Sequence, residues 1–389
     1  MTSRTTSRLA GLQLVNPHRF GDGGLADAFV TVPASGRGLA LPGDPGPLQV
    51  EIAGAGRLWS LPEWNAITHG TSLVVLDRGR LVHEWYADGV DRDDLFLGAS
   101  MTKSALAHLV GVAQRAGALR LTDRVVDHVP ELAGTGYEPC TVLDVATMTS
   151  GVDWVEDHRD PAGPASRLLA CFGGDGGSSR ELLTTVGART APGTRFEYCT
   201  ADSQVLDWVR ERATGATYDV ALGELWRTLG CTSDAVVGTD AAGVVMAGGS
   251  LAATALDWAR LALLQVDGTA AGDRVLDADW VDRSSTPSLP FLRPGRLPSA
   301  ITTHAGFGLH WWPLDDAGRR VTADGSRGQF GFVDRDLGIA VVKTSRWPYE
   351  ELLVDRQLRD LSYLGLPLVA QAAAARRTEQ PKRAKEPAP

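Results

Sequence analysis

Short apolar segments of strand character lie in the first and last parts of the chain, whereas the middle follows a helical period. Residues 72–86 form two β-type segments around a turn at 77–79, a pattern that predicts a β-hairpin. Strand character returns at 306–313 and at 329–345, where a turn at 334–336 predicts a second β-hairpin. A closing helix is expected over 350–364.

The first strong helical pattern begins at Ser100. Gly117 marks its expected end, because glycine readily adopts the backbone conformation that follows a helix. The apolar face of this segment comprises Leu106, Leu109, Val110 and Ala113. Ser100 therefore lies where a strand-rich segment passes into a helix.

This order of elements predicts an α+β fold, in which an antiparallel sheet is flanked by helices and interrupted by an inserted, mainly helical lobe. We expect residues 46–115 and 290–370 to form the sheet domain and residues 116–289 to form the lobe. Residues 1–45 are expected to be an arm lying over the fold, and residues 371–389 a disordered tail. The active cleft then falls between the two lobes.

Composition and charge exclude several classes of function. The 389-residue chain has a net charge of −9 and lacks the clustered Lys and Arg that nucleic acids require. No run is long and apolar enough for a signal peptide or a membrane span, so we expect a cytoplasmic protein without a membrane partner. The four cysteines have no zinc-type spacing, and we expect reduced thiols, no metal and no cofactor. A homodimer is left open.

The scarcity of lysine draws attention to Lys103. Only four of the 38 basic residues are lysines: Lys103, Lys343, Lys382 and Lys385. A buried lysine, unlike arginine, can lose its proton near neutral pH. Lys103 is therefore a candidate general base, and chance retention of one lysine is the alternative interpretation.

The sequence Ser100-Met101-Thr102-Lys103 places a hydroxyl and an amine three positions apart. On a helix, residues at this spacing share one face, so the amine can reach the hydroxyl. A neutral amine that takes the hydroxyl proton turns serine into a nucleophile. A backbone N–H at the start of the helix can face a developing oxyanion. The motif therefore predicts acyl chemistry at Ser100.

Three stretches resemble the motifs of the serine β-lactamase-like superfamily, and together they run from about residue 60 to 365. The first, LGASMTKSALAHLVGVAQRAGALRLTDRVVDHVPEL with TVLDVATMTSGVDW, resembles the SxxK region of class C β-lactamases, family VIII esterases and 6-aminohexanoate-dimer hydrolases. The last of these groups is the nearest. FEYCTADSQVLDWVRERATG resembles the tyrosine-containing second motif, and GFGLHWW with ADGSRGQ resembles the third.

The resemblance implies roles for further residues. It places Tyr198 opposite the nucleophile and implies an oxyanion hole made by the backbone amides of Ser100 and Ser326. Substrate contacts are expected from Trp154, Trp311, Trp312, Gly325 and Gln329. For Tyr198 and the tryptophans, packing in the core is the alternative, and Gly325 could equally be a bulge glycine.

Two departures from these relatives bear on the substrate. Ala323 stands where class C β-lactamases have the lysine that attracts a substrate carboxylate, and Ala247 stands where 6-aminohexanoate-dimer hydrolases often have asparagine. Lys343-Thr344-Ser345 resembles the KTG triplet but is out of register.

We therefore expect a serine hydrolase that acts through an acyl-enzyme on a small ester or short amide. Lys103 would deprotonate Ser100, and Tyr198 would shuttle the proton to the leaving group. The alternatives are a β-lactamase or DD-peptidase, an acyltransferase, and a catalytically silent binding protein.

Overall fold

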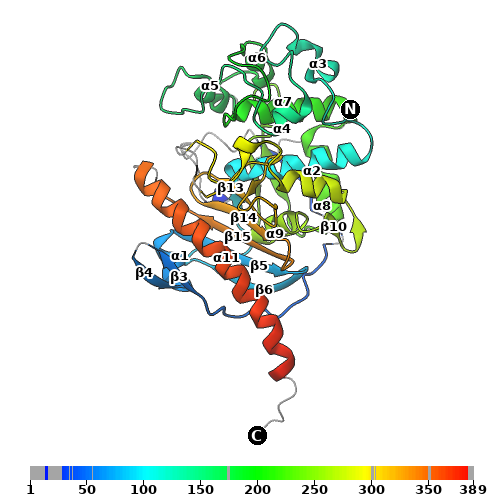
Figure 1. Cartoon of the computed structure of the whole chain (residues 1–389). Helices are drawn as coiled ribbons and strands as arrows, with labels where there is room; N and C mark the ends of the chain where they lie inside the picture. The colour runs from blue at the N-terminus through cyan, green and yellow to red at the C-terminus, as the bar shows by residue number, and fades with distance from the viewer. Residues whose placement is uncertain are drawn as a thin grey trace.

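A six-stranded antiparallel sheet joins the two ends of the chain (Figure 1). The computed structural model describes residues 14–15, 29–34, 36, 38–54, 56–172, 176–298, 302, 304–348 and 352–383. The strand order is β12 (Trp312–Pro313), β13 (Arg320–Gly325), β14 (Gln329–Asp334), β15 (Ile339–Ser345), β5 (Gly70–Asp77) and β6 (Arg80–Tyr86). Because β5 pairs with β15, strands from both ends of the chain form one sheet, which confirms the predicted α+β class.

Both predicted hairpins are present in this sheet. Asp77 pairs with Arg80, so the β5–β6 loop has two residues, and Arg78 and Gly79 have positive φ angles of 47° and 77°. Two positive φ angles match the right-handed twist of the flanking strands. The β14–β15 hairpin pairs Asp334 with Ile339.

Helices cover both faces of the sheet, which explains its nearly continuous apolar strands. Side chains on a strand alternate between faces, so consecutive residues enter different cores. Val74 and Val342 pack into a core with helices α2 (Thr102–Arg115) and α9 (Ala255–Leu263). Leu73 and Val341 pack into a second core with α1 (Leu61–Ile67) and the C-terminal helix α11 (Leu352–Arg383).

A second sheet was not predicted from the sequence. It has five strands in the order β1 (Leu14–Val15), β7 (Leu95–Leu97), β9 (Leu251–Ala253), β8 (Ala235–Gly238) and β2 (Phe29–Val32). Within residues 1–45, which we expected to be an arm, β2 pairs with β8 in antiparallel register. The strands are at most four residues long, too short for the alternation of apolar residues to identify them.

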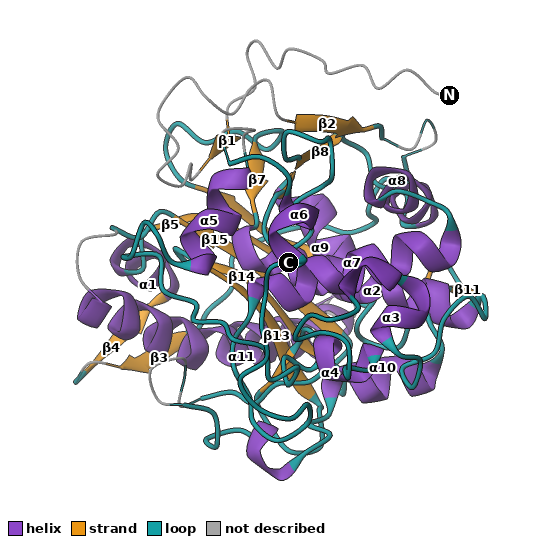
Figure 2. Cartoon of the chain, turned by 90° about the horizontal axis from the view of Figure 1, so that it is seen from above, coloured by secondary structure: helices purple, strands orange, loops and turns teal. Residues whose placement is uncertain are grey.

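The segment between the two halves of the main sheet is largely helical. Seen from above in Figure 2, helices of this segment lie in front of strands β13, β14 and β15. These helices are α3 (Val125–His128), α4 (Val142–Ala146), α5 (Pro164–Cys171), α6 (Ser179–Leu183), α7 (Thr200–Thr214), α8 (Tyr218–Thr228) and α10 (Ala278–Ser285). Helix α9 belongs to the same segment but packs on β5 and β15, so this segment also contributes to the core of the sheet.

The remaining elements are short. Two-stranded sheets are formed by β3 (Glu51–Gly54) with β4 (Arg57–Ser60) and by β10 (Thr269–Ala270) with β11 (Asp273–Arg274). The 3₁₀ helices in the described part of the chain are η2 (Ala99–Met101), η3 (Pro130–Leu132) and η4 (Pro290–Leu292). Among the described residues, no helix has the length and apolar character needed to cross a membrane.

Helix α11 is longer than the sequence predicts. It crosses one face of the sheet and continues through residues 371–383, where we expected disorder (Figure 1). Alanine-rich sequence favours a helix even when few apolar residues are available. Arg377 also makes two hydrogen bonds of 2.7 Å to the carboxylate of Asp77, which ties this part of the helix to β5. Residues 384–389 lie outside the described chain.

Candidate active site

Ser100 lies in a short irregular turn between β7 and α2, as the sequence predicts. The turn is the 3₁₀ helix η2, and Ala99, immediately before Ser100, has a φ of 47°. This left-handed conformation is uncommon for a residue with a side chain and often marks a functional site. The turn brings the Ser100 hydroxyl to the start of α2.

Lys103 lies one helical turn further on, and its amine reaches the Ser100 hydroxyl. The distance from Lys103 Nζ to Ser100 Oγ is 3.1 Å, and Nζ also donates a 2.6 Å hydrogen bond to the Gly248 carbonyl. Only 3% of the Lys103 surface is exposed. The three-residue spacing therefore produces the contact that the sequence predicts.

The surroundings of Lys103 make it a better base than a solvated lysine. Burial lowers the pKa of Lys103 to about 8, although the negative charge of Glu156 opposes this shift. Burial has this effect because an ammonium ion loses its hydration inside the protein. A sizeable fraction of Lys103 is therefore neutral near pH 8, and a neutral amine can accept the Ser100 proton.

Tyr198 completes a group of three side chains. Burial raises the pKa of the Tyr198 hydroxyl well above its usual value, although a hydrogen bond with the Ser100 side chain works against this rise. The Tyr198 ring centroid lies 5.2 Å from Lys103 Nζ. A tyrosine with a raised pKa remains a neutral phenol, which can donate a proton to a departing group.

Strand β13 packs directly against the turn that contains Ser100. A Cβ atom added to Gly325 would lie 2.1 Å from the Gly98 carbonyl oxygen and 3.0 Å from the Met101 nitrogen. Any side chain at this position would therefore collide with the turn that carries Ser100. Glycine lets the two backbones approach, and Ser326 follows at the end of the strand. The oxyanion role of the Ser100 and Ser326 amides stays a prediction.

The predicted aromatic contacts divide into two groups. The Trp312 ring stacks on Tyr198, with centroids 5.7 Å apart, so Trp312 is part of the site. Trp154 is fully buried and donates a hydrogen bond of 2.6 Å to Glu156 Oε2, which places it behind the site.

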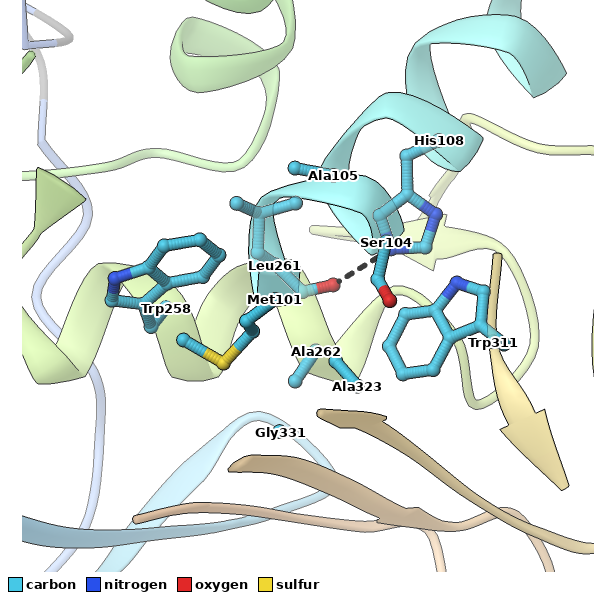
Figure 3. A pocket seen from close by; sticks show the side chains of 10 residues that line it. All are labelled: Met101, Ser104, Ala105, His108, Trp258, Leu261, Ala262, Trp311, Ala323 and Gly331. Atoms are coloured by element: carbon cyan, nitrogen blue, oxygen red, sulfur yellow. Dashed lines mark hydrogen bonds between the residues drawn. The ribbon is translucent and has the colours of Figure 1, made fainter. Parts of the chain in front are cut away.

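Trp311 and Gln329 are buried in the core, in positions that do not support the predicted substrate contacts. Trp311 lines a small internal cavity behind α2, next to His108 and Ala323 (Figure 3). It packs in the core beside α2, whereas Trp312 packs in the core beneath α11. The Gln329 amide donates to the carbonyls of Arg327 and Ser345 and so secures the β13–β14 turn.

Two acidic groups near the site were missed in the sequence. Glu156 accepts hydrogen bonds from the backbone and the side chain of Thr200, at 3.0 and 2.5 Å. Asp324, next to Gly325, accepts hydrogen bonds of 2.9 Å from Arg359 and 2.8 Å from the Tyr363 hydroxyl. These contacts span 35 to 44 residues, so no local pattern identifies them.

A second buried lysine lies outside this group. Lys343, in β15, donates a 2.5 Å hydrogen bond to Ser345 Oγ and lies 5.1 Å from the ring of Trp64. Burial lowers its pKa to about 7. Its side chain faces the core beneath α1 and α11. This position agrees with the prediction that the Lys343-Thr344-Ser345 triplet is out of register with the third motif. Among the described residues, no cluster of three His, Cys, Asp or Glu side chains is placed to hold a metal ion.

Comparisons with known proteins agree with this architecture. The chain is 31% identical over 342 residues to the 6-aminohexanoate-dimer hydrolase of Paenarthrobacter ureafaciens, covering 85% of this chain and 86% of that protein. A solved structure from Bacillus anthracis, provisionally assigned as a 6-aminohexanoate-dimer hydrolase, superposes with a TM-score of 0.75 at 19% identity, covering 88% of this chain and 90% of the other.

More distant structures share the fold. EstCE1, described as a hydrolase with promiscuous acyltransferase activity, superposes with a TM-score of 0.60 at 17% identity, covering 77% of this chain and 97% of EstCE1. Residues 65–364 match the Beta-lactamase family, a span that contains Ser100, Lys103 and Tyr198. This protein is therefore a member of the β-lactamase family and a hydrolase of the β-lactamase superfamily.

Proposed function

We propose that this protein is a serine hydrolase that cleaves carboxylic esters or short amides through an acyl-enzyme at Ser100. The observation that carries the proposal is the 3.1 Å contact between Lys103 Nζ and Ser100 Oγ, made by an amine whose pKa burial lowers to about 8. The relationship to a 6-aminohexanoate-dimer hydrolase supports an ester or amide substrate.

The first half-reaction forms the acyl-enzyme. Neutral Lys103 takes the Ser100 proton while Oγ attacks the substrate carbonyl, giving a tetrahedral oxyanion. We assign its stabilisation to the backbone amides of Ser100 and Ser326. Tyr198 then donates its proton to the leaving oxygen or nitrogen as the bond to carbon breaks, and the Lys103 ammonium returns a proton to Tyr198.

The second half-reaction releases the acid. Water replaces the leaving group, and the same side chains accept its proton and return one to Ser100 Oγ. The balance is one ester or amide bond and one water consumed, and one acid and one alcohol or amine released. An acyltransferase would use the same acyl-enzyme and pass the acyl group to an alcohol or amine instead.

Hydrolysis of p-nitrophenyl butyrate by the Ser100→Ala variant tests this proposal. We expect activity to fall to the uncatalysed background, because the variant removes the hydroxyl that lies 3.1 Å from Lys103 Nζ. Ser104→Ala is the matched control, because Ser104 lies next to Lys103 in α2 but its hydroxyl donates to the His310 carbonyl. We expect this control to retain most activity. Unchanged turnover in Ser100→Ala would reject the proposed nucleophile.

A further inference from the structure

Glu156 is a largely buried carboxylate that the proposed reaction does not use. It lies between α4 and α5 and faces the first turn of α7. Its oxygens accept hydrogen bonds from the Trp154 indole, the Thr200 backbone and the Thr200 hydroxyl. Thr200 is the first residue of α7, so the carboxylate caps the positive end of that helix.

A short chain of contacts connects this carboxylate to Lys103. The Thr200 methyl group packs against Gly248: a Cβ atom added to Gly248 would lie 2.7 Å from Thr200 Cγ2 and 3.6 Å from Lys103 Nζ. Lys103 in turn donates to the Gly248 carbonyl at 2.6 Å. Glu156 and Lys103 thus lie on either side of Thr200 and Gly248, where little water screens their charges.

The two charges influence each other. Glu156 raises the pKa of Lys103, although burial has the larger, lowering effect. Burial also raises the pKa of Glu156, but a hydrogen bond from His158, the Lys103 charge and the Thr200 hydrogen bonds together hold it at about 2. Glu156 therefore remains charged throughout the titration of Lys103. Cys199, His310 and Tyr198 are further titratable groups that interact with Lys103.

We propose that Glu156 is a positioning residue that fixes the start of α7 and supplies the negative charge opposite Lys103 when the amine carries the Ser100 proton. The inference rests on the proposed function, in which Lys103 is the base. Proton transfer from Ser100 creates an ammonium ion in a dry site, and a fixed carboxylate nearby stabilises that ion. Because Tyr198 precedes Thr200 by two residues, the same carboxylate also orients the phenol.

Titration of Lys103 in the Glu156→Gln variant tests the charge directly. The chain has only four lysines, so signals from ε-¹³C-lysine can be assigned by substitution and followed by NMR. We expect the Lys103 midpoint to move to lower pH by about one pH unit or more, because the ammonium loses its nearby counter-charge. The acidic limb of kcat/KM should move with it, and the plateau should fall about tenfold because the amine is a weaker base.

Three further variants separate charge from shape. Thr200→Val removes one hydrogen bond to Glu156 but keeps the carboxylate. Glu197→Gln removes a charge one residue before Tyr198, from a side chain that is paired with Arg195 at the surface. Both variants should leave the Lys103 midpoint within about 0.3 pH unit of the wild type. Thr200→Val keeps the Glu156 charge, and solvent screens the surface charge that Glu197→Gln removes. Glu156→Asp should restore most of the wild-type midpoint.

The outcomes separate this inference from the proposed function. An unchanged Lys103 midpoint in Glu156→Gln overturns the inference even if the enzyme hydrolyses esters normally. A midpoint that moves equally far in Thr200→Val also overturns it, because hydrogen bonding rather than charge would then be responsible. Absence of ester hydrolysis by the wild type rejects the proposed function, whereas the NMR titration still decides whether Glu156 controls the charge of Lys103.

Discussion

At the residue scale, two buried lysines in the same chain have different surroundings. Burial lowers the pKa of Lys103 to about 8 and that of Lys343 to about 7. Lys103 lies beside the Ser100 hydroxyl in a strained turn, whereas Lys343 lies in the middle of a sheet with Trp64 and Ser345. A lowered pKa alone therefore does not single out a candidate base, and the adjacent Ser100 hydroxyl makes Lys103 the stronger candidate.

Substitution of Lys103 by arginine tests the base. Arginine keeps a positive charge and much of the length, but it cannot become neutral near physiological pH. We expect kcat/KM for p-nitrophenyl butyrate to fall by about a thousandfold or more, with the melting temperature measured in parallel to confirm folding. Near-normal activity would show that another group deprotonates Ser100.

Lys343→Met tests the cost of the second buried lysine. Its lowered pKa means that the unfolded chain holds this proton up to a higher pH than the folded chain. Charging Lys343 therefore destabilises the wild type fully below about pH 7, and the penalty disappears as pH rises towards the unfolded pKa. We expect the variant to have the higher melting temperature, with a larger difference at pH 6 than at pH 10. A difference that does not depend on pH would contradict this account.

At the element scale, helix α11 and strand β13 hold the edge of the site together. Asp324 on β13 is buried and is bound by Arg359 and Tyr363 of α11. Burial raises the pKa of Asp324, and these two partners oppose that rise. Since Gly325 follows Asp324 directly, the hydrogen bonds from Arg359 and Tyr363 to Asp324 fix the strand that packs on the turn containing Ser100.

Tyr363→Phe tests this anchor. The variant removes one hydrogen bond to a buried carboxylate, and we expect a loss of about 1–3 kcal/mol in the free energy of unfolding, measured by urea denaturation. Tyr218→Phe is the matched control, because the buried Tyr218 hydroxyl has no hydrogen-bond partner among the described residues. Equal losses in the two variants would show that the Asp324 contact contributes nothing specific.

At the scale of the whole molecule, strands from both halves of the chain form one sheet. Strand β13 of this sheet, which ends at Gly325, lies against the turn that contains Ser100 and against helix α2. This arrangement could be predicted because both hairpins combine strand-type segments with a short polar turn, and because Ser100 and Lys103 are three residues apart. Local patterns determine such features. The sequence also indicated which family the chain resembles.

Other features depend on contacts that no local pattern records. Glu156 reaches Thr200 across 44 residues, and Asp324 reaches Arg359 across 35. Trp311 and Trp312 are adjacent but pack in different cores, Trp311 beside α2 and Trp312 beneath α11, and only Trp312 meets Tyr198. Residues 371–383 were predicted to be disordered because this alanine-rich segment has few large apolar residues, but they continue helix α11.

The residue at position 323 bears on the preferred substrate. Ala323 stands where class C β-lactamases have the lysine that attracts a substrate carboxylate, so this position supplies no cation. We expect p-nitrophenyl butyrate to be hydrolysed with a kcat/KM at least about a hundredfold above that of a chromogenic cephalosporin, because the charge-assisted contact is missing. Comparable values for the two substrates would favour a β-lactamase instead.

The rate at which a fluorophosphonate labels Ser100, followed by intact mass between pH 5 and 10, tests the central claim most directly. We predict a single adduct on Ser100, absent from Ser100→Ala, that forms faster as pH rises with a midpoint near the Lys103 pKa of about 8. Labelling at another residue, or a rate on Ser100 that does not change with pH, would contradict the account.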